Sequence, residues 1–526
     1  MCCEGRLRAP FCLRPAAAAV KLLVALTFKL NGGFVAMKRL VTAALFAVTT
    51  SLLGSCVTNM TTGKQTVGIG SMKSEIERVR KTHEEIVKAY GLYDDQALQD
   101  YVNEVGTRVV KHSHMPDAEF KFYVVDQETV NAFTTGCCNV YVHRGLLLKL
   151  NSEAELASVL GHESGHVTAR HPARQQAKGI FAQVLATGAA IATGSSAVAD
   201  LASIGAEAWF QGYGRENEME ADRLGMQYAA AAGYRPEAMG EVMNLFKADE
   251  RFEIDRARTE GREPQIYHTI FDSHPTPDKR AVQAAKGAAN ISEEPPGGWV
   301  ENRDIYLHKI EGLAYGSSKA QGIVRDNRMY HGPLGITIAF PKGWTVENQP
   351  DRVVAFTPNK DSYVLMRMEA KPANKSPREY LLEAAKTVGV VSGDSFTSNG
   401  MEGYAAVTRT GSQIDNGQGP MRVIAMYRGN SVYLFAGASR SYAGGVPEAD
   451  GLIQSVARTL RGLKPSEFAL AEPYRIRLRT ATAKTKLADF AAAVPLPKYQ
   501  KEELELLNNM YPGGNPKPGS VFKTVE

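Results

Sequence analysis

The stretch SEAELASVLGHESGHV, residues 152–167, predicts a buried helix that carries a metal-binding motif. Ser152 and Glu155 have the spacing of an N-terminal capping box, and the apolar residues after them have helical spacing. His162-Glu163-Ser164-Gly165-His166 is an H-E-x-x-H motif. Because positions i and i+4 share a helix face, both imidazoles can bind one zinc ion. Glu163 is then placed to take a proton from water.

A third metal ligand is expected, because a catalytic zinc ion commonly has three protein ligands. The best candidate lies in Glu216-Asn217-Glu218-Met219-Glu220-Ala221-Asp222, where three glutamates compete. Glu218 and Asp222 are four residues apart on one helix face. Glu218 can therefore bind the metal while Asp222 accepts the N–H of a ligand histidine. Glu220 is expected to point elsewhere and to be solvated.

Around this motif, residues 73–290 predict a mainly helical domain with a small β-sheet. Helical periodicity covers 72–110, 153–171, 215–232 and 236–249, and strand alternation covers 119–125 and 139–144. The Ala/Gly-rich segment 179–209 predicts a pair of packed helices, with a dip into a membrane as the alternative.

These motifs together resemble the HtpX/Ste24/Oma family of zinc metallopeptidases, in particular its BepA/LoiP-like periplasmic branch. The resemblance covers residues 75–285. Besides residues 152–167, it rests on Asn131-Ala132-Phe133, Tyr141 to Leu147, Glu218 to Gly225, Ala232 to Pro236, and Ser273 to Arg280.

The resemblance implies a zincin-type (gluzincin) domain with zinc bound by His162, His166 and Glu218, and with Glu163 as catalytic base and acid. It also implies substrates that are misfolded or incompletely assembled proteins. His274 is the family-matched donor to the oxyanion, with Arg280 beside it in the same motif. Three roles stay open for His274: a donor, a ligand that plugs the resting zinc site, and a structural turn residue.

One departure from the family pattern is Gly136-Cys137-Cys138, where relatives usually have Pro-Gly-Gly. The strand 139–144 after it is expected to form the edge of the cleft, where an extended substrate pairs as a further strand. For the two cysteines we favour small packed thiols, with a vicinal bridge in an oxidising periplasm as the alternative.

The N-terminus predicts a processed leader. Lys38 and Arg39 precede an uncharged apolar run, 40–53, which is too short to span a bilayer, and small residues lead to Cys56. We expect residues 1–36 to be a non-native extension, 37–55 a lipoprotein signal peptide, Cys56 the lipidated residue and 56–72 a tether; a short membrane anchor is the alternative. Val57 favours delivery to the outer membrane.

Charge excludes one class of function. The chain has 526 residues, with 61 Lys and Arg against 56 Asp and Glu. Seven of these basic residues and only one acidic residue, Glu4, fall within residues 1–55. The rest of the chain is therefore close to neutral, and its composition gives no reason to expect nucleic-acid binding.

Two further units are predicted after a linker over 291–320, which opens with Glu293-Glu294-Pro295-Pro296-Gly297-Gly298. Residues 321–465 alternate as an α+β domain that weakly resembles the PsbP/Mog type. Residues 470–526 predict strand, helix, helix, strand, and Leu506 to Asn509 resemble a degenerate LysM module. Peptidoglycan is a candidate ligand of this module.

The overall prediction is an α+β, zinc-dependent endopeptidase that is lipid-anchored in a bacterial cell envelope and faces the periplasm. It is expected to hydrolyse misfolded or misassembled outer-membrane proteins. The alternative is a zinc-containing chaperone or scaffold that binds unfolded proteins or peptidoglycan with little proteolysis.

Overall fold

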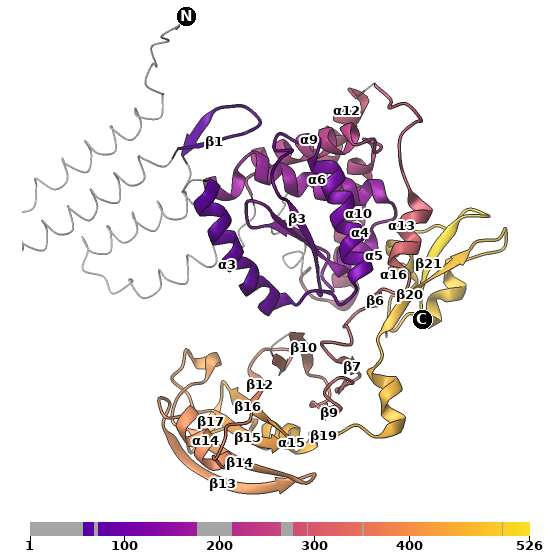
Figure 1. Ribbon diagram of the computed structural model, residues 1–526. Helices are drawn as coiled ribbons and strands as arrows, with labels where there is room; N and C mark the ends of the chain where they lie inside the picture. Colours follow the sequence, from indigo (N-terminus) through magenta and orange to yellow (C-terminus); the bar gives the residue numbers. More distant parts are fainter. Residues whose placement is uncertain are drawn as a thin grey trace, which may run out of the picture.

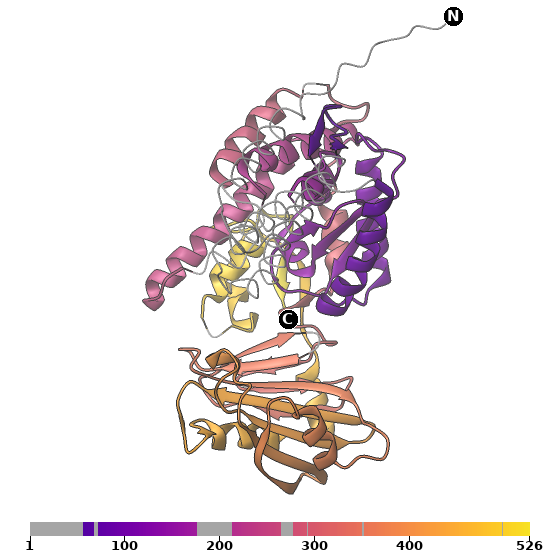
Figure 2. The ribbon, with the colours of Figure 1, turned by 90° about the vertical axis from the view of Figure 1, so that its left-hand side faces the viewer.

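The computed structural model describes residues 56–67, 72–175, 213–264, 277–291, 293–349, 352–496 and 498–526. Figures 1 and 2 show these residues as two bodies: a helical body that contains both ends of the described chain, and a β-rich body below it. The predicted signal peptide and the helix pair at 179–209 lie outside the described residues. Over the described ranges, no helix is both long enough and apolar enough to cross a membrane.

The helical body has a three-stranded sheet in the order β3 (Lys121–Val125), β5 (Asn139–His143), β4 (Ala132–Thr134). Strand β5 pairs in parallel with β3 and antiparallel with β4. The predicted strand 139–144 is therefore the centre of the sheet and not its edge, which corrects the expected cleft edge. The edge strand β4, three residues long, contacts the helix that carries the H-E-x-x-H motif.

Helices surround this sheet. The motif-bearing helix α6 (Glu153–Thr168) is buried along its whole length. The other helices are α3 (Met72–Tyr90), α4 (Gln96–Val110), α5 (Arg144–Lys149), α9 (Arg215–Ala231), α10 (Ala238–Glu260), α12 (Pro277–Ala289) and α13 (Arg303–Ile310). The predicted helices are thus confirmed over their described parts, and α10 runs further than the sequence pattern indicated.

The predicted tether is partly folded. Residues 56–67 form a hairpin of β1 (Cys56–Thr58) and β2 (Gln65–Val67). Val57 and Asn59 are each only 4% exposed. The backbone N–H of Met60 donates to the carbonyl of Thr168, the last residue of α6, at 3.1 Å. Because the last carbonyls of a helix lack partners inside the helix, this bond completes the end of α6.

The predicted linker is also partly folded into the helical body. Tyr306 and Leu307 of α13 are fully buried in the same core as α6, so packing does not stop at residue 290. After α13, the backbone at residues 314–316 is bound by the buried side chain of Arg144, before the chain enters the β-rich body. Arg144 donates to the carbonyls of Ala314 at 2.5 Å and Gly316 at 2.7 Å, and it pairs with Asp126.

The C-terminal segment has the predicted order of elements, but it is not a separate unit. It runs β20 (Tyr474–Thr480), a 3₁₀ helix η4 (Leu487–Ala493), α16 (Gln500–Leu507) and β21 (Val521–Val525), and β20 also pairs with β6 (Ala314–Tyr315). Leu504, Leu507 and Val525 belong to the core that includes α6. In Figures 1 and 2 this yellow segment lies against the helical body.

Buried polar groups hold the C-terminal segment in place. The side-chain nitrogen of Lys523, which is fully buried, donates to the carbonyls of Leu148 and Leu150 at 2.6 and 2.8 Å. The side chain of Asn508 accepts from the N–H of Lys523 and donates to its carbonyl. The asparagine that suggested a LysM module is therefore 4% exposed and used inside the fold.

The β-rich body is a seven-stranded antiparallel sheet with helices on both faces. Its order is β10 (Thr345–Gln349), β11 (Arg352–Phe356), β12 (Ser362–Ala370), β16 (Ser431–Ser439), β15 (Arg422–Arg428), β14 (Met401–Thr408), β13 (Val390–Ser398). Alternate residues of β15 point to opposite faces: Val423 and Ala425 pack with α14 (Pro377–Ala384), and Ile424 and Met426 with α15 (Asp450–Thr459).

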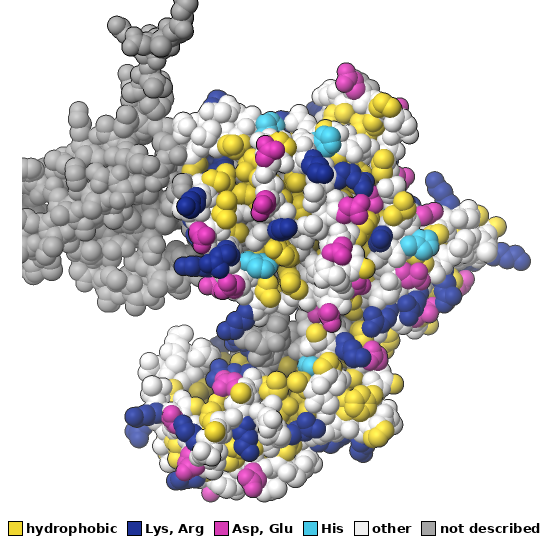
Figure 3. Space-filling view, in the orientation of Figure 1, with side chains coloured by type: hydrophobic (Ala, Val, Ile, Leu, Met, Phe, Trp, Pro, Cys, Tyr) yellow, Lys and Arg dark blue, Asp and Glu magenta, His cyan; other side chains and the backbone are white. Residues whose placement is uncertain are grey.

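A smaller sheet of β19 (Arg461–Gly462), β9 (Ile336–Ala339), β8 (Arg328–His331) and β7 (Ile323–Arg325) adjoins α15. Short elements complete the body: η2 (Gln413–Asp415), β17 (Tyr442–Ala443), β18 (Val446–Pro447) and η3 (Pro465–Ala471). Figure 3 shows Lys and Arg interspersed with Asp and Glu over both bodies on the face in view. No single sign of charge dominates that face.

Candidate metal centre

Helix α6 presents the two motif histidines from a buried position. It begins at Ser152, whose hydroxyl accepts from the N–H of Glu155 at 3.2 Å. His162 and His166 lie one turn apart near its other end, and their Nε2 atoms are 3.0 Å from each other. His166 is fully buried and His162 is 5% exposed. The two imidazoles therefore meet as the H-E-x-x-H spacing predicts.

Three glycines let α9 approach α6 closely enough to add the third ligand. A Cβ on Gly225 would lie 2.5 Å from the backbone nitrogen of His162, and one on Gly161 would lie 2.7 Å from the carbonyl oxygen of Gly225. Gly165 faces Ala221 in the same way. Side chains at these positions would force the helices apart, so the glycines set the distance between them.

Glu218 of α9 reaches the two histidines across this contact. Its carboxylate oxygens lie 3.6 Å from Nε2 of His162 and 3.4 Å from Nε2 of His166, and the side chain is fully buried. Ligand atoms from the three residues all lie within 4.8 Å of one another. Of the three competing glutamates, Glu218 is the one that joins the histidines.

The donor set fits a zinc ion. Tetrahedral zinc with N and O ligands at about 2.0–2.2 Å places its ligand atoms roughly 3.3–3.6 Å apart, close to the separations between these three residues. Each histidine also uses its Nδ1 atom elsewhere, so Nε2 faces the shared point. Two neutral imidazoles and one carboxylate form a common ligand set of catalytic zinc sites.

Asp222 orients His162, as its spacing from Glu218 predicts. Oδ1 of Asp222 lies 2.8 Å from Nδ1 of His162. Arg280 binds the same carboxylate with two nitrogens, each at 2.7 Å. Burial alone would raise the pKa of Asp222, but Arg280 and His162 hold that pKa well below its usual range. Asp222 is therefore ionised and accepts the histidine N–H.

The structure brings Arg280 to the two buried carboxylates of the centre. Its guanidinium pairs with Asp222 and, through Nη1, with Glu218 at 3.0 Å, and the side chain is 3% exposed. It therefore connects the third ligand to the residue that orients the first. His274, its predicted partner in oxyanion stabilisation, lies outside the described residues, so its three alternative roles stay predictions.

His171 contacts one of the two motif histidines, and the sequence analysis did not single it out. Nδ1 of His171 lies 2.8 Å from Nδ1 of His166. The chain turns back after α6 at Arg170, which has a left-handed φ of 64°. The only sequence signal was the spacing of five residues between His166 and His171. Because α6 ends at Thr168, that spacing does not predict where the side chain of His171 lies.

Glu220 is bound by His171 and is only partly exposed, whereas the sequence predicted a solvated side chain. Its Oε2 atom accepts from Nε2 of His171 at 3.2 Å, and its side chain is 23% exposed. The hydrogen bond with His171 lowers the pKa of Glu220 to about 2. Burial lowers the pKa of His171, which keeps that imidazole neutral.

Glu163 lies beside a mostly apolar pocket. Met239, Val242, Met243 and Phe246 line it from one face of α10, and His162, Glu163 and Arg280 line it from the metal side. The pocket is small, with a cavity volume of about 20 Å³. Glu163 is 1% exposed.

Tyr213, which the sequence analysis did not single out, stacks on the ring of His166 with centroids 4.0 Å apart.

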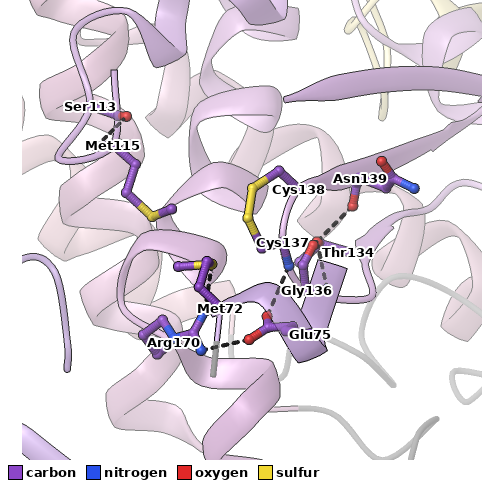
Figure 4. Close-up of a disulfide and its surroundings, with 10 residues drawn as sticks. All are labelled: Met72, Glu75, Ser113, Met115, Thr134, Gly136, Cys137, Cys138, Asn139 and Arg170. Carbon is purple, nitrogen blue, oxygen red and sulfur yellow. Dashed lines mark hydrogen bonds and ion pairs between the residues drawn. A yellow bond between two sulfur atoms is a disulfide. The ribbon is translucent and has the colours of Figure 1, made fainter. Parts of the chain in front are cut away.

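Cys137 and Cys138 form a vicinal disulfide in the turn between β4 and β5 (Figure 4), which corrects the prediction of two packed thiols. The pair is buried. The N–H of Cys137 donates to Glu75 at 2.9 Å, and Glu75 pairs with Arg170 at 2.6 Å. The disulfide is thus joined to the end of α6 through Glu75.

Comparisons with known proteins agree with this centre. The family model of Peptidase family M48 matches residues 96–288. The chain is 31% identical over 240 residues to the beta-barrel assembly-enhancing protease of Escherichia coli K12, covering 44% of this chain and 46% of that protein. It is also 31% identical over 144 residues to the mitochondrial metalloendopeptidase OMA1 of Arabidopsis thaliana, covering 27% of this chain and 29% of that protein.

The chain thus spans less than half the length of these curated relatives. Among solved structures, cyanobacterial PsbP from Synechocystis aligns with 28% of this chain and 98% of that chain, at 12% identity and a TM-score of 0.19. That score is too low to support an argument, so the PsbP/Mog resemblance of the β-rich body stays a prediction.

Proposed function

Residues 96–288 of this chain form a metallopeptidase domain of Peptidase family M48, and from this premise we propose that the protein is a zinc-dependent endopeptidase of a bacterial cell envelope. We propose that it hydrolyses peptide bonds in misfolded or misassembled outer-membrane proteins. The observation that carries the proposal is the meeting of His162, His166 and Glu218 around one point, with Glu163 next to it in the sequence.

Zinc, when bound by these three residues, supplies Lewis-acid activation of a water molecule and of the scissile carbonyl. Glu163 accepts the proton of the attacking water and returns it to the leaving amine nitrogen. Asp222 keeps the hydrogen of His162 on Nδ1, so that its Nε2 lone pair faces the metal. Arg280 compensates the charges of the two buried carboxylates in this arrangement.

Two features support an unfolded polypeptide as substrate. β4 is an edge strand of the sheet beside α6, and an extended peptide can pair with such an edge by main-chain hydrogen bonds. The α10 side chains beside Glu163 are apolar, which matches the hydrophobic side chains that a folded protein buries and an unfolded one exposes. The name of the Escherichia coli relative refers to β-barrel assembly, which is consistent with outer-membrane substrates.

We further propose that Cys56 is lipidated and anchors the protein to the outer membrane, facing the periplasm. The support is the sequence pattern before Cys56. Replacing Cys56 by Ser should release the protein into the soluble periplasmic fraction. A full-length chain that stays in the membrane with Met1 at its N-terminus would contradict this anchor.

The experiment for the function compares cells that produce the wild-type protein or Glu163→Gln while an outer-membrane protein misassembles. The wild type should shorten the half-life of the misassembled protein, and Glu163→Gln should leave it unchanged. If both shorten it equally, the protein acts by binding, as in the chaperone or scaffold alternative. Purified protein and unfolded casein give the matching test in vitro.

A further inference from the structure

The hairpin of residues 56–67 contacts a residue that leads to the metal centre. Its turn is closed by Asn59, whose Oδ1 accepts from the N–H and the hydroxyl of Thr61 at 2.8 and 2.6 Å. With Oδ1 so engaged, Nδ2 of Asn59 points to Oε1 of Glu220 at 3.4 Å. The hydroxyl of Thr61 lies 3.3 Å from the same oxygen.

From Glu220 the contacts continue to a metal ligand. Oε2 of Glu220 is 3.2 Å from Nε2 of His171, and Nδ1 of His171 is 2.8 Å from Nδ1 of His166. Asn59 and His171 are 4% and 0% exposed, so water does not compete freely for these bonds. Residues from the hairpin, from α9 and from the turn after α6 thus form one connected set.

The hydrogens of this set have one consistent arrangement. Nε2 of His166 faces His162 and Glu218, so its hydrogen is on Nδ1 and donates to Nδ1 of His171. His171 must then carry its own hydrogen on Nε2, which donates to Glu220. The carboxylate of Glu220 can accept from His171 and Asn59 together, while the single hydroxyl hydrogen of Thr61 is donated to Oδ1 of Asn59. In this arrangement His166, His171 and Asn59 each donate one hydrogen to the next residue of the set.

We propose that His171 and Glu220 are positioning residues for the metal ligand His166, and that the hairpin completes this support by fixing Glu220. The proposal rests on the zinc site proposed above. It gives the segment after Cys56 a function that a tether lacks: the chain between the predicted lipid and Asn59 is part of the structure that orients a metal ligand. Partners of this kind commonly change metal affinity about 10–100-fold when removed.

The test measures zinc affinity on the full chain, by competition with a coloured chelator. His171→Ala should weaken zinc binding about 10–100-fold. Asn59→Asp keeps the acceptor that closes the turn but replaces the donor to Glu220 by a second carboxylate. It should weaken binding roughly 3–10-fold, because its effect passes through two further hydrogen bonds. The melting temperature of the metal-free protein checks that each variant is folded.

Two comparisons separate positioning from general stabilisation. Glu220→Gln should weaken zinc binding, whereas Glu216→Gln, an exposed residue on the same helix, should not. In the double variant Asn59→Asp/His171→Ala, the first change should have no further effect, because its path to the metal is already broken.

Variants that bind zinc as tightly as the wild type, or a double variant whose effects add in full, would overturn the proposal. A wild-type protein that binds no zinc would overturn the proposed function as well. Tight wild-type binding with unchanged variants would overturn this inference alone.

Discussion

Nη1 of Arg280 lies 3.0 Å from the carboxylate of Glu218, so the proposed third metal ligand is paired with a buried cation from α12. The same guanidinium binds Asp222. Removing one partner from a buried ion pair leaves uncompensated charge in the interior, and such changes commonly cost about 3–5 kcal/mol. The pairing therefore stabilises the centre before any metal binds.

We accordingly expect Arg280→Met to lower the free energy of unfolding of the metal-free protein by about 3–5 kcal/mol, measured by urea denaturation. Arg223→Met is the matched control, because Arg223 is exposed and bonds only Gln227 of the same helix among the described contacts. Its effect should stay within about 0.5 kcal/mol. Equal effects of the two substitutions would contradict the role assigned to Arg280.

The close crossing of α6 and α9 predicts the effect of Gly225→Ala. The added Cβ would lie 2.5 Å from the backbone nitrogen of His162, and backbone atoms cannot move aside as a flexible side chain can. We expect a loss of about 1–3 kcal/mol in stability and weaker zinc binding, as Glu218 moves away from the histidines. Gly240→Ala on α10 meets no atom within 4 Å and should be neutral or stabilising. Zinc affinity unchanged by Gly225→Ala would show that the helix distance does not matter.

The burial of His143, which is not one of the proposed metal ligands, predicts that the free energy of unfolding depends on pH. Burial lowers the pKa of His143 to about 4, against 6.5 in an unfolded chain. Between these values the unfolded state binds more protons, so stability is fully present above pH 6.5 and falls as the pH drops towards 4. The loss from this group is about 3 kcal/mol. Metal-free His143→Gln should show a flatter profile over that range in denaturant titrations; a profile parallel to the wild type would contradict the assignment.

Lys523 predicts that the C-terminal segment stabilises the metallopeptidase domain. Lys523→Met leaves the buried carbonyls of Leu148 and Leu150 without their N–H donor and should lower the free energy of unfolding by about 1–3 kcal/mol. The temperature at which the protein releases zinc should therefore fall. Lys517→Met, at an exposed position in the loop before β21, is the control and should leave it unchanged. A release temperature insensitive to Lys523→Met would mean that the two segments unfold independently.

The proposed metal ligands, and Asp222 beside them, were predictable from sequence because each pair is local. His162 with His166, and Glu218 with Asp222, lie four residues apart on regular helices, where spacing alone fixes a shared face. That α6 and α9 meet at all came from the family resemblance, since no periodicity reveals a contact between helices. The close-packing glycines are informative only once the two helices are known to cross.

The missed residues depend on non-local structure. His171 reaches His166 through a left-handed turn at Arg170, a conformation that is uncommon for arginine and has no reliable sequence signal. Asn59 lies in a polar stretch that predicts a tether, and only its docking on α6 buries it. Strand β13 gives no clear sequence signal, because its exposed position at the edge of the sheet does not require apolar alternation. The Pro-Pro-Gly-Gly turn marks a break in secondary structure, but α13 after it packs back into the same core.

The most direct measurement is the zinc content and casein cleavage of three purified proteins: wild type, His166→Ala and Glu163→Gln. If His166 is a ligand and Glu163 the base, His166→Ala loses both zinc and cleavage. Glu163→Gln keeps about one zinc ion per chain and loses cleavage. A Glu163→Gln protein that has lost its zinc, or one that still cleaves casein at the wild-type rate, would contradict the proposed metal centre.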